Sequence, residues 1–338
     1  MNSKFQAAKA AFAVAAMSLA LVAVAQAQAP APAPKVGSIV YAGFDGAPLN
    51  LTEQVAIEKG LFAARGLDVK FVGAASGQLM VSTLLGGSAQ IATLTISATA
   101  PLFKQGQCFQ YLTSGARTYY NLIAQPEMNL PNAGLGFPGN LVDLKGKKVG
   151  VNARGTAMEF MMDALLKQAG MVPTDITYIA VGGSATGSAA FRNKQVDVLM
   201  NFPIAEQLLK PNEFKSVARL MEIEKNNPIY NMPQVFSGAT CAYVKSNPAI
   251  IAAFCAAVGD AYRYVNNPAN RNEVIGVVQK TMKIDQPTAE SFWQQYKGSW
   301  PTAKIDTTGW DSQKILLPTG TSLPPYAEVV SSACQGAV

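Results

Sequence analysis

The stretch from Asp143 to Gly170 constrains the fold more than any other part of this 338-residue chain. Val149–Val151 is a short apolar run typical of a buried parallel strand, and the polar turn 152–156 follows it. Apolar residues then recur at helical spacing up to Gly170, a residue type that commonly ends a helix. Such a unit points unpaired helical N–H groups at whatever lies above the turn, where the helix dipole favours negative charge. We therefore expect an α/β fold with half of a ligand site at this turn.

The same alternation of short apolar runs, small or polar turns and helical patterns continues along the rest of the chain. Strands are predicted at Gly37–Gly43, Val69–Val72, Ala89–Leu94, Ile176–Val181, Val196–Met200 and Gly238–Val244. This pattern predicts α/β sheets with helices on both faces. In open sheets of that kind, ligands bind outside the carboxyl ends of the strands.

The N-terminus carries the features of an export signal over residues 1–27. Lys4 and Lys9 provide a basic segment, an apolar Ala-rich run follows, and Ala25-Gln26-Ala27 fits a cleavage site of small residues. We interpret the run as a signal peptide and not as an uncleaved anchor, because it is short and rich in Ala for a membrane span. Since no Cys stands near the cleavage site and there is no twin Arg, we expect Sec export to the periplasm without a lipid anchor.

The mature part of the chain is long enough for two lobes. Residues 28–36, rich in Ala and Pro, are expected to form an extended tether before the first strand. About 300 residues follow, more than one hydrophobic core usually contains. The formal net charge of +6 includes Lys4 and Lys9, and no block of Lys or Arg occurs, so we expect no nucleic-acid partner.

The chain contains no histidine, which excludes Ser-His-Asp and Cys-His catalysis and HExxH zinc sites. Its four cysteines, Cys108, Cys241, Cys255 and Cys334, form no CxxC pair, so neither a metal site nor a cofactor is predicted. In an oxidising compartment we expect one or two structural disulfides among three possible pairings. Cys241 lies in an apolar, strand-like run and could instead be a buried thiol.

Three segments resemble a known family. They are Glu58–Val69 (EKGLFAARGLDV), Asp143–Val151 (DLKGKKVGV) and the stretch from Ala189-Ala190-Phe191 to Val196-Asp197-Val198. In this order they are similar to segments of the periplasmic substrate-binding proteins of ABC importers, in the branch that handles nitrate, sulfonates, taurine and thiamine-pyrimidine precursors. The similarity spans nearly the whole mature chain.

The resemblance implies a two-lobed periplasmic binding protein fold of type II with a ligand cleft between the lobes. Two hinge crossings would fall near Tyr120–Pro126 and Phe236–Val244, and the lobes would close over the ligand. Residues 37–124 together with 238–338 would form lobe one, and residues 125–237 lobe two. The implied partners are a small-molecule ligand and a permease in the inner membrane, and we expect a monomer.

The candidate ligand-binding residues lie where a predicted strand gives way to a turn or to the start of a helix. They are Phe44, Asp45, Ser76, Gln78, Thr95, Ser97, Arg117 and Tyr119 in the first lobe, and Asn152, Arg154, Thr156, Ser184, Thr186 and Asn201 in the second. Hydroxyl and amide groups there can donate to an anionic or polar ligand without burying a full counter-charge. The alternative interpretation is that the Ser, Thr and Asn side chains only cap helices.

Arg117 and Arg154 are the candidates for a positive charge in the cleft, because a guanidinium can bind a carboxylate or sulfonate through two parallel hydrogen bonds. Alternatively, each forms a surface or interlobe salt bridge. Aromatic side chains that could stack on an organic ligand are those of Phe44, Tyr119, Tyr120, Phe202 and Phe236.

The resemblance implies the solute-binding component of an ABC importer, and the candidate site residues indicate that it captures a small, anionic organic solute of the sulfonate or carboxylate type. A periplasmic sensory or chemotaxis module would share the fold and the cleft. A pyrimidine-precursor binding protein or an enzyme of the same fold is a weaker alternative, since such enzymes use His or a cleft Cys. We predict no catalytic residue, because there is no His and no Cys falls in a predicted ligand turn.

Overall fold

The computed structural model describes residues 34–74 and 76–336, so the predicted signal peptide and most of the predicted tether lie outside the described residues. The described residues form one compact unit, which contains both sheets. Within the described residues, every helix is too short or too polar to cross a membrane.

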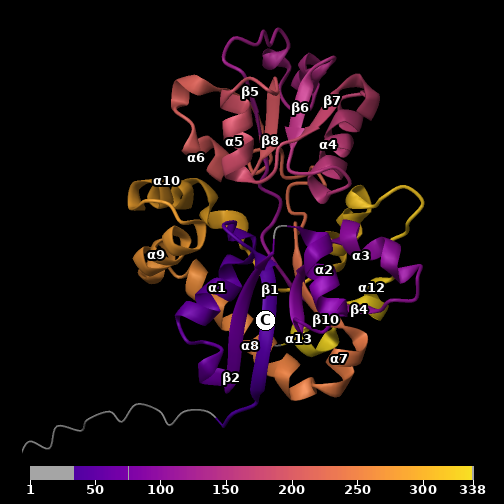
Figure 1. Cartoon of the computed structure of the whole chain (residues 1–338), viewed down its shortest axis with the longest axis vertical. Coiled ribbons are helices and arrows are strands. Elements are labelled where there is room, and N and C mark those ends of the chain that lie inside the picture. Colours follow the sequence, from indigo (N-terminus) through magenta and orange to yellow (C-terminus); the bar gives the residue numbers. More distant parts are fainter. Residues whose placement is uncertain (1–33, 75, 337–338) are drawn as a thin grey trace, which may run out of the picture. The chain divides into compact units, whose positions relative to one another are not determined.

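The first sheet has five strands in the order β2-β1-β3-β10-β4 (Figure 1). Its strands are β1 (Gly37–Phe44), β2 (Leu67–Ala74), β3 (Ile91–Leu94), β4 (Phe109–Ser114) and β10 (Phe236–Thr240). β1 is parallel to β2 and β3, whereas β10 is antiparallel to both of its neighbours. Helices follow the three parallel strands: α1 (Leu51–Glu58), α2 (Gly77–Leu85) and α3 (Ile96–Phe103).

The second sheet repeats this topology in the order β7-β6-β8-β5-β9. Its strands are β5 (Asn121–Ala124), β6 (Lys148–Val151), β7 (Thr177–Ala180), β8 (Val198–Asn201) and β9 (Lys215–Arg219). β6 is parallel to β7 and β8, and β5 is antiparallel to both of its neighbours. The helices α4 (Ala157–Gln168), α5 (Ser184–Arg192) and α6 (Ile204–Leu208) follow the parallel strands, so the predicted strand–turn–helix unit at 143–170 is confirmed.

Two segments connect the sheets, residues 115–120 between β4 and β5 and residues 220–235 between β9 and β10. Each connecting segment leads into a strand, β5 or β10, that is antiparallel to its neighbours in the sheet it joins. β5 pairs in the second sheet, and Phe236 of β10 pairs with Leu94 in the first. The predicted strand Gly238–Val244 is wrong in its second half. β10 ends at Thr240, whose hydroxyl oxygen accepts a hydrogen bond from the Tyr243 N–H and so caps a helix.

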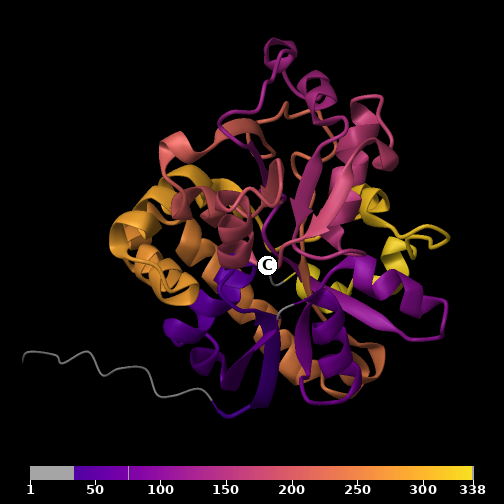
Figure 2. The same cartoon turned by 45° about the horizontal axis from the view of Figure 1, so that its top comes forward.

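The C-terminal part of the chain is helical. It contacts helices that follow the strands of the first sheet and also helices that follow the strands of the second sheet. Its helices are α7 (Cys241–Ser246), α8 (Pro248–Asn266), α9 (Arg271–Met282), α10 (Gln286–Tyr296), α11 (Thr307–Ser312), α12 (Tyr326–Val329) and α13 (Ser332–Gln335). α8 packs on α1, while α10 packs on α9 and also on α6 of the second sheet (Figures 1 and 2). The predicted two-lobed α/β fold is confirmed, and α10 adds a contact between the lobes.

All four cysteines form disulfides. The two disulfides lie in the part of the structure that carries the first sheet. Cys108, just before β4, is bonded to Cys241 at the start of α7, and Cys255 of α8 is bonded to Cys334 of α13. Cys241 is therefore not a buried thiol. Both bonds close long loops, of 133 and 79 residues by sequence separation, so each restricts the unfolded chain strongly.

Replacing Cys255 and Cys334 together by Ala is expected to lower the free energy of unfolding by about 2–5 kcal/mol, the usual cost of losing a native disulfide. Urea unfolding of the oxidised protein and the double variant measures the difference. The same variant should lose its sensitivity to a reductant at this bond, while the bond between Cys108 and Cys241 remains. Equal stability of the two proteins would contradict a stabilising role.

A polar network lies buried beneath the first sheet around Glu53 of α1, which is 1% exposed. Its carboxylate accepts hydrogen bonds from the hydroxyl of Ser237 at 2.6 Å and from that of Thr52 at 2.9 Å. Ser237 is in turn hydrogen-bonded to the hydroxyl of Tyr41 at 2.9 Å. Burial raises the pKa of Glu53 above its ordinary value of 4.5, and the hydroxyl donors offset only part of that shift.

The folded protein should therefore hold the Glu53 proton to a higher pH than the unfolded chain does. Its contribution to stability is fully present below about pH 4.5 and is lost as the pH rises through the folded-state pKa. We expect Glu53→Gln to remove this loss, so that the stability of the variant relative to the native protein increases from pH 4 to pH 8. Urea unfolding across that range tests it, and parallel pH profiles for the two proteins would contradict it.

Candidate functional site

The ends of the two sheets meet at one small cavity of about 30 Å³. Residues from both lobes and from both connecting segments line it. They are Phe44, Leu49, Ser76, Gly77, Gln78, Thr95, Ser97, Tyr120, Asn152, Thr156, Ala157, Met158, Phe202, Gln234 and Val235. The predicted residues that the structure brings together here are Phe44, Ser76, Gln78, Thr95, Ser97, Asn152 and Thr156, together with the aromatic candidates Tyr120 and Phe202.

Two helices of the first lobe begin at the cavity. Ser76 precedes α2, and its hydroxyl oxygen accepts a hydrogen bond from the Leu79 N–H at 3.2 Å, so the capping interpretation holds for this residue. Thr95 precedes α3 but its side chain does not cap the helix; its hydroxyl oxygen accepts a hydrogen bond from the Ser97 hydroxyl at 3.2 Å. The first-turn N–H groups of α3 therefore lack a side-chain cap and begin at the cavity wall.

One helix of the second lobe begins at the cavity from the opposite side. Thr156 precedes α4, and its hydroxyl donates to the Asn152 side-chain oxygen at 2.8 Å and to the Ala153 carbonyl at 2.9 Å. It makes no side-chain capping bond to α4. Ala157 and Met158, the first two residues of the helix, both line the cavity. Three helix N-termini from two lobes thus converge on one space.

The electrostatics of the cavity come from dipoles, because the residues that line it include no Asp, Glu, Lys or Arg. The N-termini of α2, α3 and α4 each carry a partial positive charge, which favours a negative ligand. Burial raises the pKa of the Tyr120 hydroxyl well above its usual range, so this group stays neutral and can donate. Within residues 34–74 and 76–336, no group of three or more Cys, Asp and Glu side chains is arranged to hold a metal ion.

Arg117 does not line this cavity. Its guanidinium lies over the ring of Tyr230 at 4.5 Å and donates to the side-chain oxygen of Asn231 at 3.1 Å, next to a separate cavity of about 40 Å³ that Lys304 and Asp306 also line. These contacts join the two connecting segments to each other. We therefore leave Arg117 out of the proposed ligand site.

Arg154 and Asp45 are both engaged at the surface. The Arg154 guanidinium pairs with the Glu159 carboxylate at 2.9 Å and lies over the Tyr178 ring, which matches the alternative salt-bridge interpretation. Glu159 raises the pKa of Arg154. Asp45 pairs with Lys283 at 3.5 Å, and both side chains are exposed. Neither predicted residue lines the cavity.

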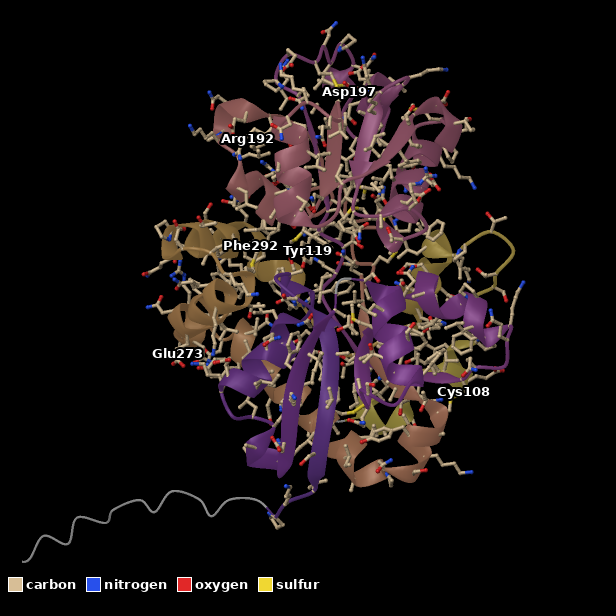
Figure 3. All side chains as sticks on the ribbon, in the orientation of Figure 1. Cys108, Tyr119, Arg192, Asp197, Glu273 and Phe292 are labelled. Carbon is tan, nitrogen blue, oxygen red and sulfur yellow. A yellow bond between two sulfur atoms is a disulfide. The ribbon has the colours of Figure 1, made fainter. Side chains whose placement is uncertain are left out.

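The other predicted residues surround the site without lining it. Tyr119, which Figure 3 shows between the two sheets, is fully buried and packs against Phe202, Tyr296 and Trp300. The Asn201 side-chain oxygen accepts hydrogen bonds from the Phe202 N–H at 2.7 Å and the Ser184 hydroxyl at 3.3 Å. Thr186 donates to the Gly183 carbonyl at 3.1 Å. Among the aromatic candidates, Phe236 packs in the core against Tyr111 and Trp310.

Sequence reasoning missed several lining residues, of which Gln234 is the most polar and Leu49 and Val235 are apolar. Gln234 is 2% exposed and lies two residues before β10. The sequence pattern points to residues that follow the carboxyl end of a strand, and Gln234 is not one of them. Because β10 is antiparallel to β3, the residues before β10 lie at the edge of the sheet where β3 ends. The turn signal of the adjacent Pro233 is the only local feature that could have pointed there.

With this geometry, comparison with known proteins becomes informative. The family model described as "NMT1/THI5 like" matches residues 138–271. Similar solved structures include a protein from Bordetella bronchiseptica RB50, with 22% identity, a TM-score of 0.74 and coverage of 89% of this chain and 96% of that chain. The periplasmic aliphatic sulphonate binding protein SsuA from Escherichia coli has 17% identity and a TM-score of 0.66, over 83% and 85% of the two chains. The fold is that of a periplasmic binding protein.

A third similar structure is the periplasmic nitrate-binding protein NrtA from Synechocystis PCC 6803, with 16% identity, a TM-score of 0.62 and coverage of 76% of this chain and 69% of that chain. No curated protein matches the sequence. The resemblance inferred from the sequence is confirmed by the family model and by these neighbours, which at such identities show the fold.

Gly77 allows the close approach of α2 to α3 at the cavity. A Cβ atom at this position would lie 2.8 Å from the Thr95 hydroxyl oxygen. We expect Gly77→Ala to lower the free energy of unfolding by about 1–3 kcal/mol, the usual cost of overpacking a closely packed site. Gly134→Ala is the matched control, since a Cβ there meets no atom within 4 Å. Urea unfolding measures both, and a Gly77→Ala variant as stable as the control would refute the close approach.

Proposed function

We propose that this protein is the extracytoplasmic solute-binding component of an ABC-type importer. It captures a small, anionic organic solute of the sulfonate or carboxylate type between its lobes and delivers it to a permease in the inner membrane. The observation that carries this proposal is the convergence of the α2, α3 and α4 N-termini on a cavity without charged side chains. Such N-termini bind oxyanions through backbone N–H groups and the helix dipole.

The size of the cavity supports a role in holding the head group of a solute. A volume of about 30 Å³ admits only a few non-hydrogen atoms, since a single water needs about 10–15 Å³ on the same measure. Phe44, Tyr120 and Phe202 add aromatic surface against which the organic part of a solute can pack. Entry of a larger solute requires the lobes to separate, which is the hinge motion expected for a two-lobed binding protein.

The contacts between the lobes support closure around a ligand. The side-chain amide of Gln78 at the start of α2 donates to the Gly155 carbonyl before α4, at 3.4 Å. α10 packs against α6 across the same divide. The second lobe also packs on the C-terminal part of the chain through α4 and residues Gln313–Leu316, so opening of the lobes would separate this surface as well. A closed pair of lobes would present one joint surface to the permease.

Binding without catalysis is part of the proposal. The sequence has no histidine, and each of the four cysteines is held in a disulfide, so there is no free thiol to act as a nucleophile. The sulfonate-binding and nitrate-binding neighbours are binding proteins by description, which supports the same conclusion. We infer that the protein acts in the periplasm, as a monomer and without a cofactor.

The anion site can be tested by placing a carboxylate in it. Ser97 lies in the first turn of α3 and is 5% exposed. We expect Ser97→Asp to fold, because an acidic side chain at a helix N-terminus is stabilised by about 0.3–1 kcal/mol. The same carboxylate should abolish binding of anionic solutes by occupying the donors and repelling the ligand. Ser97→Asn, similar in size and neutral, is the matched control.

The measurement is a thermal-shift screen with ethanesulfonate, benzenesulfonate, acetate, benzoate and nitrate and with neutral pyrimidines, followed by titration calorimetry of any ligand found. A ligand present at about a hundredfold over its Kd adds roughly 2.7 kcal/mol to stability. We expect at least one anion to stabilise the native protein and the Asn variant but not the Asp variant. Equal binding by the Asp variant, or stabilisation by neutral solutes alone, would overturn the anion site.

A further inference from the structure

The side chain of Gln234 has both of its polar atoms unsatisfied at the cavity wall. The residue is 2% exposed, and among the described residues neither its Nε2 nor its Oε1 has a partner at hydrogen-bond geometry. The Tyr120 hydroxyl is the polar group beside this amide, but it does not make a hydrogen bond of normal geometry with it. A buried amide without partners costs free energy, which a suitable ligand recovers by pairing with it. Gln234 is therefore arranged to contact whatever occupies the cavity.

The backbone around Gln234 is held firmly. Its N–H donates to the Ala116 carbonyl at 2.8 Å, and the Gly115 N–H donates to the Val235 carbonyl at 2.8 Å. Both connecting segments thus fix the Cα position of Gln234, at the point where they run side by side. A side chain whose Cα is held in this way presents its amide to a ligand from a fixed point on the wall of the cavity.

The other polar groups at the cavity are mostly donors or have their acceptors occupied. The helix N-termini offer only N–H groups. The Asn152 side-chain oxygen accepts from Thr156, and the Thr95 hydroxyl oxygen accepts from Ser97. Among the described residues, Gln234 Oε1 is the buried amide oxygen of the lining without a donor, whereas the Gln78 amide is exposed to solvent. An acceptor-only anion would satisfy the N-termini but leave the Gln234 oxygen unpaired.

We propose that the ligand is a short anion with a neutral hydrogen-bond donor near its acidic group, a hydroxy-carboxylate or hydroxy-sulfonate. Its acidic group faces the helix N-termini, and its hydroxyl donates to Gln234 Oε1 and accepts from Nε2. An ammonium group fits less well, because the cavity lining has no carboxylate to pair with it. This inference rests on the anion site proposed above and adds the substituent that the site selects.

Two matched ligand series test the proposal. Ethanesulfonate, isethionate and taurine share one skeleton and differ in bearing a hydrogen, a hydroxyl or an ammonium group; acetate, glycolate and glycine form the corresponding carboxylate series. Titration calorimetry with the native protein should show the hydroxyl compound of at least one series binding tenfold or more tightly than both of its analogues. That factor is typical when a ligand satisfies a buried polar group that its analogue leaves unpaired.

Gln234→Leu keeps the volume of the side chain but removes both polar atoms. We expect the preference for the hydroxyl compound to disappear in this variant, with the unsubstituted anion bound at least as tightly as by the native protein. Its melting temperature without ligand should not fall, because the amide makes no hydrogen bond that the substitution could break. A clear fall would assign Gln234 a structural role and overturn the proposal.

The outcomes separate this inference from the proposed function. If the anions within a series bind the native protein equally, or the ammonium compound binds tightest, the hydroxyl preference is refuted while the anion site stands. If no member of either series binds at millimolar concentration, the anion site and this inference both fail. Gln234→Glu is the further control: its carboxylate should weaken every anion in the panel, and unchanged binding would place the ligand away from Gln234.

Discussion

The hydrogen bonds between the two connecting segments are the interaction on which the site depends. Alternating bonds of 2.8 Å join Gly115 to Val235, Gln234 to Ala116 and Thr118 to Met232, so the two segments run antiparallel between the sheets. Each bond contributes only about 1 kcal/mol, but together they fix the back wall of the cavity. If the lobes move as in other two-lobed binding proteins, this ladder is the part that stays in place, and the residues on it meet the ligand in every state.

The two sheets have the same topology, and this explains why the N-termini of helices from both sheets converge on one cavity. In each sheet, helices follow the parallel strands at their carboxyl ends, and the strand that enters from the other lobe lies fourth in order and antiparallel. The entering strands β5 and β10 begin at the edge where their neighbours end, so both sheets turn their carboxyl edges toward the connecting segments. Three helix N-termini and two strand beginnings therefore share a small volume, although they come from distant parts of the sequence.

This topology also decides how much of the site the sequence could reveal. The alternating apolar runs predict the α/β fold and most of the candidate residues that line the cavity, because those residues follow a parallel strand or begin a helix. Gln234 lies before an antiparallel strand, and no local pattern gives the direction of β10, which long-range pairing with β3 sets. Arg117 and Arg154 lie outside the cavity, and the sequence could not reveal this for a different reason: it shows a guanidinium but not its partners, Tyr230 and Glu159.

The lack of charged side chains at the cavity suits a site that must be stable both with and without its ligand. An Arg buried there would need a counter-ion whenever the ligand is absent, since an unpaired buried charge costs several kcal/mol. Backbone N–H groups at helix N-termini carry only partial charges, and the fold orients them before the ligand arrives. Glu159, buried in the first turn of α4, has its charge balanced by the exposed Arg154, and its carboxylate also accepts the Gly155 N–H at 2.6 Å. The positive potential thus reaches the cavity through dipoles, and the one buried amide on its wall decides which anion fits.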